Sequence, residues 1–338
     1  MTRPYGLLRC GYPYVKTLGM RRLTNFPMDI TIGNEDRIYI ISRQESGVAV
    51  IKRYSVDDKD LGSIGEYGSG EGQLKWPVSL TTDTDENIFV SDEGTHRLTI
   101  YNLDGEYISS WGTKGSDPGY LNGPAGIAFD SEQNLYIADS KNHRIQKVTK
   151  RGKYIDSWGS FGDGAGQFNL PYGIAVDEED FVYVTDWRND RVQKFTGEGE
   201  FVFEFGNFGS RDGEFNRPCG ITVDSDGDIY IADWRNDRVQ MFDFKGSYVQ
   251  KFLGDASLSK VAREYMLTNA SPNRMRDMAN LEPQKYLRRP RSVAIDSDKM
   301  LYIADNESYR IQVYRKEVIP LTSSELAPPF RAPTLSQE

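Results

Sequence analysis

Short apolar runs alternate with polar turns along most of this chain. Leu135 to Ala138 and Ile229 to Ala232 are typical runs, nearly continuous in Ile, Leu, Tyr and Ala. Continuous runs predict strands covered on both faces of their sheet, because a strand with one exposed face would alternate apolar and polar residues. The run Arg191 to Phe195 does alternate, and clusters of Asp, Gly and Asn separate the runs. We therefore predict an all-β fold of short antiparallel strands.

The runs belong to a repeating unit. Prolines, aspartates and arginines recur every 47 residues: Pro77, Pro124, Pro171 and Pro218; Asp92, Asp139, Asp186 and Asp233; Arg97, Arg144, Arg191 and Arg238. A sixth copy, from Pro290 to Arg310, is displaced by 72 residues and leaves 25 extra residues before it. A degraded first copy begins at Pro27. Six units thus account for most of the 338 residues.

Each unit holds four predicted strands, which favours a closed six-bladed β-propeller with one four-stranded antiparallel sheet in each blade. A linear solenoid is the competing architecture. The sixth unit ends after its third strand, and Tyr14 to Gly19 matches the fourth-strand pattern of Tyr107 to Gly112. An N-terminal strand at about residues 13–19 would complete the last blade and close the ring, whereas a solenoid has no use for it.

These units resemble the NHL repeat family. The resemblance rests on the triplet Asn142–His143–Arg144 and on these parts of the fourth unit: Gly166, Phe168 and Pro171; Gly173 to Asp177; Tyr183 to Asp186; Asn189; Arg191 to Phe195; and Gly199. It covers about residues 13–315 and implies a six-bladed propeller. The first unit departs from the pattern, with Ser42 where Asp recurs and Gly47 where Arg recurs.

The resemblance and the closing strand divide the chain into three parts. We expect residues 1–25 to form an N-terminal segment with the closing strand. Residues 26–316 would form the propeller, with an insertion at about residues 255–289. Residues 317–338, rich in Pro and Ser, would form an extended or disordered tail.

Composition narrows the location and the partners. The chain has no apolar run of the roughly 18 residues that a membrane span needs, and residues 1–25 lack the apolar stretch of a signal peptide. Two cysteines, Cys10 and Cys219, are too few for a disulfide framework. We therefore expect a cytoplasmic protein without membrane contact. The net charge of −9 argues against nucleic acid, and the family's RNA-binding members use a basic face in chains that usually have other domains.

Repetition separates structural from functional candidates. We expect the recurring Asp and Arg to orient the turn between the second and third strands of each blade. In a propeller these turns open on the same face as the links between blades, and we call this side the linker face. The candidate ligand- or partner-binding residues on it are Arg43, Trp76, Glu93, Tyr172, Trp187, Arg188, Arg217, Trp234, Arg235, Arg289 and Arg291. Paired Trp and Arg suit flat or anionic partners. The alternative is Trp covering a neighbouring blade, with Arg paired to Asp190 or Asp237.

The insertion adds a second candidate element. Its segment Ser257 to Leu267 places apolar residues at helical spacing, with Ser257 as the cap. From Asp255 to Arg291 there are eight basic and four acidic residues. One hypothesis is a lid or docking element over the channel mouth that attracts an anionic ligand or an acidic partner. The other is a loop excursion packed on the rim.

The channel wall supplies a third candidate. Two residues after the leading proline, three units have Gly126, Gly173 and Gly220, where backbone must approach the axis closely. The other three units have Ser292, Asp29 and Ser79 instead. These side chains predict a polar pocket at the channel mouth, the alternative being a solvated channel lining.

Catalysis is the remaining question. Some propellers that resemble this one are metal-dependent lyases or lactone hydrolases, which need several His or carboxylate ligands at the axis. The chain has only His96 and His143, both beside the recurrent Arg, so we predict no metal site and no cofactor. Asp224, Asp226 and Asp228 resemble the start of a calcium loop, but Arg235 stands where its bidentate Glu should be.

Two functions remain after these exclusions. The leading hypothesis is a stand-alone binding or protein-interaction module that uses the linker face with Trp187, Trp234 and the basic insertion. Its partner would be a protein or a small anionic ligand. The alternative is a lyase- or lactone-hydrolase-type enzyme that acts on a small anionic molecule at the channel mouth. The sequence leaves the choice open.

Overall fold

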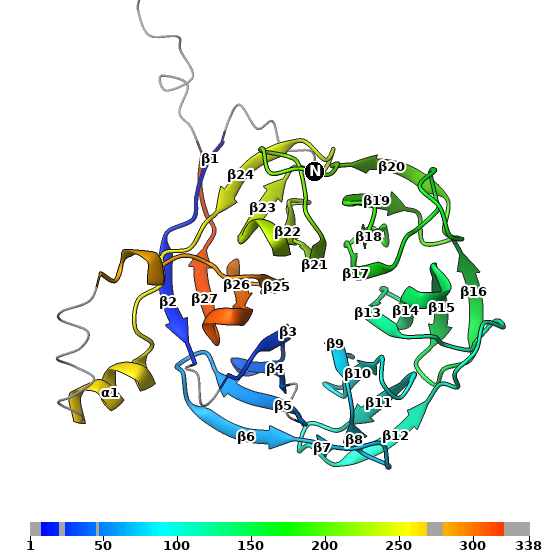
Figure 1. The fold of residues 1–338 in the computed structure, drawn as a ribbon, viewed down its shortest axis with the longest axis horizontal. Helices are drawn as coiled ribbons and strands as arrows, with labels where there is room; N and C mark the ends of the chain where they lie inside the picture. The colour runs from blue at the N-terminus through cyan, green and yellow to red at the C-terminus, as the bar shows by residue number, and fades with distance from the viewer. Residues whose placement is uncertain (1–7, 20–23, 45–46, 269–279, 321–338) are drawn as a thin grey trace, which may run out of the picture.

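The computed structural model describes residues 8–19, 24–44, 47–268 and 280–320. Within them, six four-stranded antiparallel sheets stand around a central axis as the blades of a propeller (Figure 1). The fold predicted from the repeat is therefore confirmed.

The blades contain the following strands. Blade 1 has β3 (Pro27–Ile32), β4 (Arg37–Gln44), β5 (Val48–Ser55) and β6 (Asp60–Ile64); blade 2 has β9 (Pro77–Thr82), β10 (Ile88–Asp92), β11 (Arg97–Tyr101) and β12 (Tyr107–Trp111); blade 3 has β13 (Pro124–Phe129), β14 (Asn134–Asp139), β15 (Arg144–Thr149) and β16 (Tyr154–Trp158). Blade 4 has β17 (Pro171–Val176), β18 (Val182–Asp186), β19 (Arg191–Phe195) and β20 (Phe201–Phe205); blade 5 has β21 (Pro218–Val223), β22 (Ile229–Asp233), β23 (Arg238–Phe242) and β24 (Tyr248–Phe252); blade 6 has β25 (Pro290–Ile295), β26 (Met300–Asp305), β27 (Arg310–Arg315) and β2 (Tyr14–Leu18). The remaining elements are β1 (Leu8–Gly11), β7 (Glu66–Tyr67), β8 (Gln73–Leu74), β28 (Glu317–Pro320), α1 (Lys260–Thr268) and the 3-10 turns Ser140–Asn142, Trp234–Asn236, Glu282–Gln284 and Asn306–Ser308.

The N-terminal strand closes the ring as predicted. β2 pairs antiparallel with β27, and Tyr14 lies opposite Tyr314 while Leu18 lies opposite Ile311. A second pairing was not predicted: β1 and β28 form a two-stranded antiparallel sheet beside the ring. The start of the expected extended tail is therefore a strand, and the rest of the tail lies outside the described residues.

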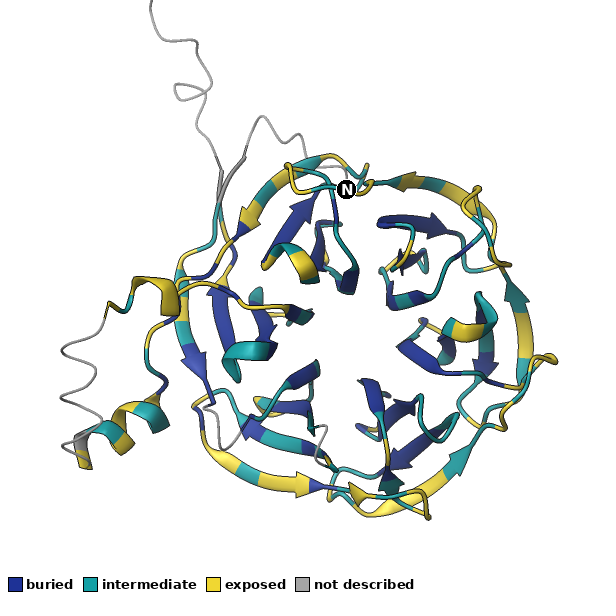
Figure 2. Cartoon of the chain, viewed as in Figure 1, coloured by how far each residue is buried: buried dark blue, intermediate teal, exposed yellow. Residues whose placement is uncertain are grey.

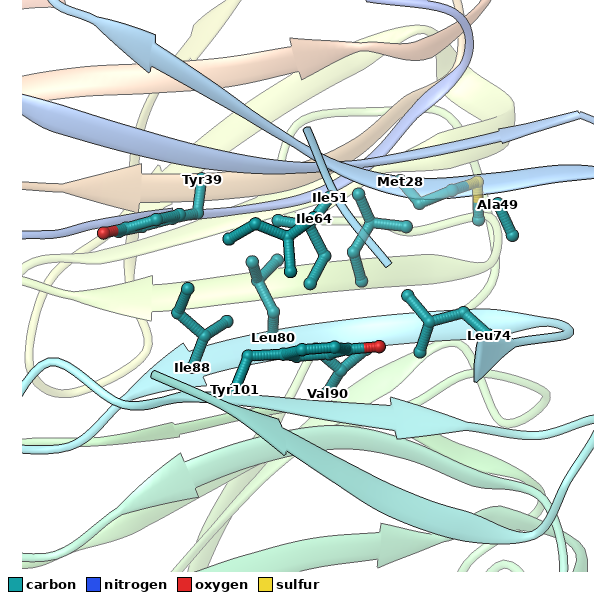
Figure 3. Close-up of a cluster of buried hydrophobic side chains, with 11 residues drawn as sticks. Met28, Tyr39, Ala49, Ile51, Ile64, Leu74, Leu80, Ile88, Val90 and Tyr101 are labelled. Atoms are coloured by element: carbon teal, nitrogen blue, oxygen red, sulfur yellow. The ribbon is translucent and has the colours of Figure 1, made fainter. Parts of the chain in front are cut away.

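Apolar side chains from neighbouring blades form the core between them. Figure 3 shows one such layer, in which Tyr39 and Ile51 of blade 1 lie against Leu80, Val90 and Tyr101 of blade 2. Each fully buried side chain of the size of Val or Ile stabilises the fold by about 1.5–3 kcal/mol. The inner three strands of each blade are largely buried, whereas much of the outer strand is exposed (Figure 2). No helix in the described ranges has the length and apolar character needed to cross a membrane.

The recurring Asp and Arg fix each turn to the preceding link. In blade 4, Asp186 accepts a hydrogen bond from Asn169 N at 2.7 Å and pairs with Arg191 Nε at 3.1 Å. Arg191 Nη2 then donates to the carbonyl oxygens of Gly164 at 2.8 Å and Gln167 at 2.9 Å. Blade 1 lacks this pair, and its strands β4 and β5 are longer, with eight residues each.

The helix of the insertion does not cover the channel mouth. Helix α1 lies outside the ring, beyond the outer strands (Figure 1). Asp58, between β5 and β6, helps to hold it there, because its carboxylate accepts hydrogen bonds from Val261 N at 3.1 Å and Gly19 N at 2.7 Å. The predicted helix is confirmed, although Ser259 and not Ser257 caps it, by accepting from Ala262 N at 3.1 Å. The lid prediction is wrong for α1, which packs on the rim; residues 269–279 lie outside the described part.

Candidate functional site

The linker face is organised as the repeat predicts. Backbone hydrogen bonds join each turn to the link before it, as from Arg188 N to Asn169 O at 3.0 Å and from Arg235 N to Asn216 O at 3.1 Å. Both segments therefore open on the same side of the ring. The residue that follows each recurrent Asp lies at the start of this turn, which places Trp187 and Trp234 on adjacent blades of one face.

Trp187 and Trp234 form the centre of an aromatic and cationic stack. Their ring centroids are 6.4 Å apart, with an interplanar angle of 37°. The guanidinium of Arg217 lies 4.9 Å from the ring centroid of Trp187. Arg291 lies 4.6 Å and Arg289 5.2 Å from the centroid of Trp234. The structure thus brings together residues of blades 4, 5 and 6 that the sequence predicts to share a face.

A second guanidinium–indole pair stands across the channel mouth. Arg43 extends from the long β4 strand of blade 1, lies 4.1 Å from the ring centroid of Trp76, and donates to Pro77 O at 3.1 Å. The two pairs border one cavity of about 440 Å³, and we call it the mouth cavity. It is lined by Phe26, Met28, Arg43, Gln44, Trp76, Trp234, Arg289, Arg291, Asn306 and Glu307. This volume falls in the range of small-molecule sites, about 300–1,000 Å³.

The charges at the mouth cavity are unbalanced. Arg289 Nε pairs with Glu307 at 3.2 Å. Arg43 and Arg291 have no ion pair with a carboxylate among the described residues, and the buried Nε of Arg291 has no hydrogen-bond partner there. Farther out, Arg188 and Arg235 are exposed, whereas Arg217 lies 3.8 Å from Asp190. The alternative of arginines neutralised by Asp190 and Asp237 is therefore not what the structure shows for Arg188, Arg235 or Arg291.

Tyr172 lies below the mouth cavity, where the central channel begins. Its hydroxyl accepts a hydrogen bond from Arg291 Nη1 at 3.3 Å. Burial raises the pKa of Tyr172 against the opposing effect of Arg291, so the phenol keeps its proton. The neighbouring thiol of Cys219 is also protonated, because burial raises its pKa to about 11. Glu93 contributes its negative charge to this region from blade 2 but does not line the mouth cavity.

Asp29, Ser79 and Ser292 lie together in the channel, where their polar groups bond to one another. Asp29 accepts hydrogen bonds from the Ser292 hydroxyl, from Leu80 N at 2.9 Å and from Ile30 N at 3.0 Å. The carboxylate thus joins blades 6, 1 and 2. Burial raises its pKa, which the hydrogen bonds from Ser292 and Ser79 partly oppose.

Glycine replaces this contact on the other side of the ring. A Cβ atom on Gly173 would lie 2.2 Å from Cys219 O, so the innermost strands of blades 4 and 5 approach too closely for a side chain there. The channel between these two sides has a volume of about 350 Å³ and shares Arg291 and Met28 with the mouth cavity. Arg291 therefore borders both the channel and the mouth cavity.

The two histidines have structural roles. Both lie at left-handed turn positions, with φ values of 58° and 54°. His96 Nδ1 accepts from Gly123 N at 3.0 Å, and His143 Nδ1 accepts from Leu170 N at 3.2 Å. Asp190 does the same in blade 4, where it accepts from Arg217 N at 2.6 Å. In blades 2 to 5 an acceptor at this position thus fastens the turn to the next link.

The carboxylates that resemble a calcium loop surround a lysine. Lys316, which precedes β28, is fully buried and pairs with Asp224, with Asp226 at 3.0 Å, and with Asp228. Its ammonium group supplies the positive charge that balances these carboxylates. Among the described residues, no group of three or more His, Cys, Asp or Glu is arranged to hold a metal ion.

Sequence reasoning missed part of the mouth cavity. Asn306 follows the recurrent Asp305 as Trp187 follows Asp186, and Glu307 occupies the next position, where Arg188 stands in blade 4. This alignment of the repeats could have placed Asn306 and Glu307 on the linker face from the sequence. Phe26 and Met28 had none, because they precede and begin the divergent first unit.

Comparisons with known proteins support the fold. The NHL repeat model matches residues 121–148, 168–195, 215–242 and 287–314. A search of curated proteins finds no match. Among solved structures, a protein of unknown function from Bacteroides thetaiotaomicron has a TM-score of 0.63 at 19% identity, covering 92% of this chain and 76% of its own. A catalytically inactive virginiamycin B lyase from Staphylococcus aureus, solved with quinupristin, has a TM-score of 0.56 at 15% identity, covering 94% and 90%.

At these identities the two likenesses concern the fold alone. The repeat matches lie in the units of blades 3 to 6, each from the end of a link through the third strand. Together with the six sheets, they identify a six-bladed β-propeller whose blades 3 to 6 are NHL repeats.

Proposed function

We propose that this propeller is a binding module whose linker face takes an anionic partner, either a small ligand or an acidic protein segment. The observation that carries the proposal is the set of arginines on this face that have no carboxylate within ion-pair distance among the described residues: Arg43, Arg188, Arg235 and Arg291. They stand on a protein whose net charge is −9. Unpaired guanidiniums of this kind favour an acidic partner by charge complementarity.

The indole rings support the same proposal. Each Trp of the stack lies beneath at least one guanidinium, which holds the arginine side chain in place and lowers the entropy lost when it binds. Tryptophan and arginine are also the residues most often found at the energetic centre of protein interfaces. Helix α1 of the insertion contributes little here, because it lies at the outer rim (Figure 1), whereas Arg289 at the end of the insertion covers Trp234.

The enzyme hypothesis has less support. Asp29, its central residue, is occupied by hydrogen bonds from three blades, and Cys219 is a protonated thiol, which is a poor nucleophile. Neither group is arranged to activate water or a substrate. We therefore propose binding and not catalysis as the function of this face.

Binding of a fluorescein-labelled hexaglutamate peptide, measured by anisotropy, tests the proposal. Arg188→Gln/Arg235→Gln/Arg291→Gln should weaken binding at least tenfold. The matched control removes three exposed positive charges from the turns of the opposite face: Arg151→Gln/Lys153→Gln/Lys245→Gln. Equal losses in both triple variants, or tighter binding of a labelled single-stranded RNA than of the peptide, would contradict the proposal.

A further inference from the structure

Two guanidiniums that have no ion pair among the described residues border the mouth cavity from opposite sides. Arg43 stands with Trp76 on the side of blades 1 and 2, and Arg291 stands with Trp234 on the side of blades 5 and 6. They are close enough for the charge of Arg291 to add to the lowering of the pKa of Arg43 that burial causes. Like charges facing each other across a cavity repel, and an anion between them would relieve this repulsion.

The indole faces at the cavity are already covered. Arg43 covers Trp76, and Arg291 and Arg289 cover Trp234. A flat aromatic ligand would have to displace these guanidiniums before it could stack. A stacked guanidinium can still use its N–H edge, which matches the geometry of carboxylate and phosphate oxygens. Arg43 and Arg291 each use Nη1 within the protein, for Pro77 O and the Tyr172 hydroxyl, and their other N–H groups remain for a ligand. The cavity is therefore suited to recognise an acidic group and not an aromatic ring.

Tyr172 adds a neutral donor in the channel below the mouth cavity, where it contacts Arg291. Its oxygen accepts from Arg291 Nη1, and its own proton has no acceptor among the described residues. An oxygen of a bound anion could accept this proton. Two guanidiniums and one phenol then provide donors on several sides of a compact anion.

The opposite face of the ring carries an acidic cavity. Between blades 3 and 4, a cavity of about 410 Å³ is lined by five carboxylates and one lysine: Asp130, Glu132, Glu179, Asp180, Glu198 and Lys147. Its negative charge repels anions. A small anion would therefore reach the molecule on the linker face.

We propose that the mouth cavity binds a small organic dianion, with its acidic oxygens held between Arg43 and Arg291 and within reach of the Tyr172 hydroxyl. This inference rests on the proposed function and names its ligand class. A second negative charge matters because Arg43 and Arg291 both lack an ion pair within the described part of the chain, while Glu307 already neutralises Arg289. A phosphate monoester and a short dicarboxylate share this chemistry.

Isothermal titration calorimetry with four probes tests the inference. Succinate and phenyl phosphate should bind, and acetate and benzyl alcohol should bind at least tenfold more weakly or not at all. Quenching of tryptophan fluorescence provides a second readout, since Trp76 and Trp234 line the cavity. Equal affinity for acetate and succinate, or tighter binding of benzyl alcohol than of succinate, would overturn the proposal.

Variants locate the site. Arg43→Gln and Arg291→Gln should each weaken succinate binding at least tenfold. Arg43→Lys should lose less affinity for succinate, because lysine keeps the positive charge. Arg188→Gln is the matched control, because Arg188 is exposed and does not line the cavity. Arg43 and Arg291 belong to different blades. If one of the two glutamine variants unfolds, succinate binding is judged on the other, provided that it keeps the wild-type melting temperature.

The two proposals fail in different ways. If the triple arginine variant loses hexaglutamate binding but neither dianion binds the wild type, the proposed binding face stands and the small-dianion site is overturned. Succinate binding that is unaffected by Arg43→Gln and Arg291→Gln would place the ligand elsewhere. Absence of binding for the peptide and both dianions would overturn both proposals.

Discussion

Lys316 has the same function in blade 5 that Lys194 has in blade 4. Lys194 Nζ lies 3.6 Å from Asp177, and Lys316 pairs with Asp224, the residue 47 positions after Asp177. The position that corresponds to Lys194 in blade 5 is Met241, which is fully buried. The residue before β28 thus supplies the charge that the repeat itself omits.

Lys316→Met should lower the free energy of unfolding by about 3–5 kcal/mol, because it leaves buried carboxylates without their cation. Met241→Lys in the same chain restores the recurrent lysine and should recover part of the loss. Urea denaturation of the single and double variants measures both effects. A double variant no more stable than Lys316→Met would mean that a lysine at 241 does not reach Asp224.

The two histidines predict a pH dependence of stability. Burial lowers the pKa of His96 and of His143, so the folded state favours neutral imidazoles that accept hydrogen bonds. Their contribution is complete above the unfolded pKa of about 6.5 and is lost as the pH falls toward the folded values. His96→Asp/His143→Asp keeps an acceptor, as Asp190 does in blade 4. Melting temperatures at pH 7.5 and 5.5 should differ less in this variant than in the wild type, and an equal difference would contradict the assignment.

Asp58 predicts how the insertion is held. Asp58→Ala removes the acceptor for Val261 N at the start of α1 and for Gly19 N after the closing strand. Loss of a helix-capping acceptor costs about 1 kcal/mol, so α1 should become more mobile while the blades stay folded. Hydrogen exchange of residues 255–268 measures this change. Asp57→Ala is the control, because Asp57 is exposed; equal exchange in both variants would exclude the role of Asp58.

Replacement of Asp29 tests whether its carboxylate is structural or catalytic. Asp29→Ala leaves Leu80 N and Ile30 N without their acceptor and should lower the free energy of unfolding by about 1–3 kcal/mol. Binding of succinate should persist, because Asp29 does not line the mouth cavity. Denaturation and calorimetry on the same preparation measure both. Stoichiometric metal in the wild type that is lost in Asp29→Ala would instead support the enzyme hypothesis.

The ring was predictable because its determinants repeat in register. Each Asp and Arg acts within its own blade and the adjacent link, so one unit explains the others. The closing strand was predictable for the same reason, since Tyr14 to Leu18 carries the pattern missing after Tyr314. Contacts that lie within one repeat unit can therefore be predicted from a single sequence.

The path of the insertion was not predictable because it depends on a distant contact. Val261 bonds to Asp58, which lies far earlier in the chain, and no spacing rule connects the two. The pairing of β1 with β28 and the position of Lys316 depend on contacts of the same kind. The linker-face candidates were predictable in position, whereas their convergence on one cavity also required the extended β4 strand that carries Arg43.

The antiparallel pairing at the join has a mechanical consequence. Leu8 lies opposite Pro320 and Gly11 opposite Glu317, so the two outward-leading ends of this sheet are adjacent. A force that pulls these ends apart would load one backbone hydrogen-bonded pair at a time, in unzipping geometry. β2 and β27 continue in the same orientation, from Tyr14 opposite Tyr314 to Leu18 opposite Ile311. Tension would thus peel the closing strand from the sixth blade one residue pair at a time and open the ring at this join.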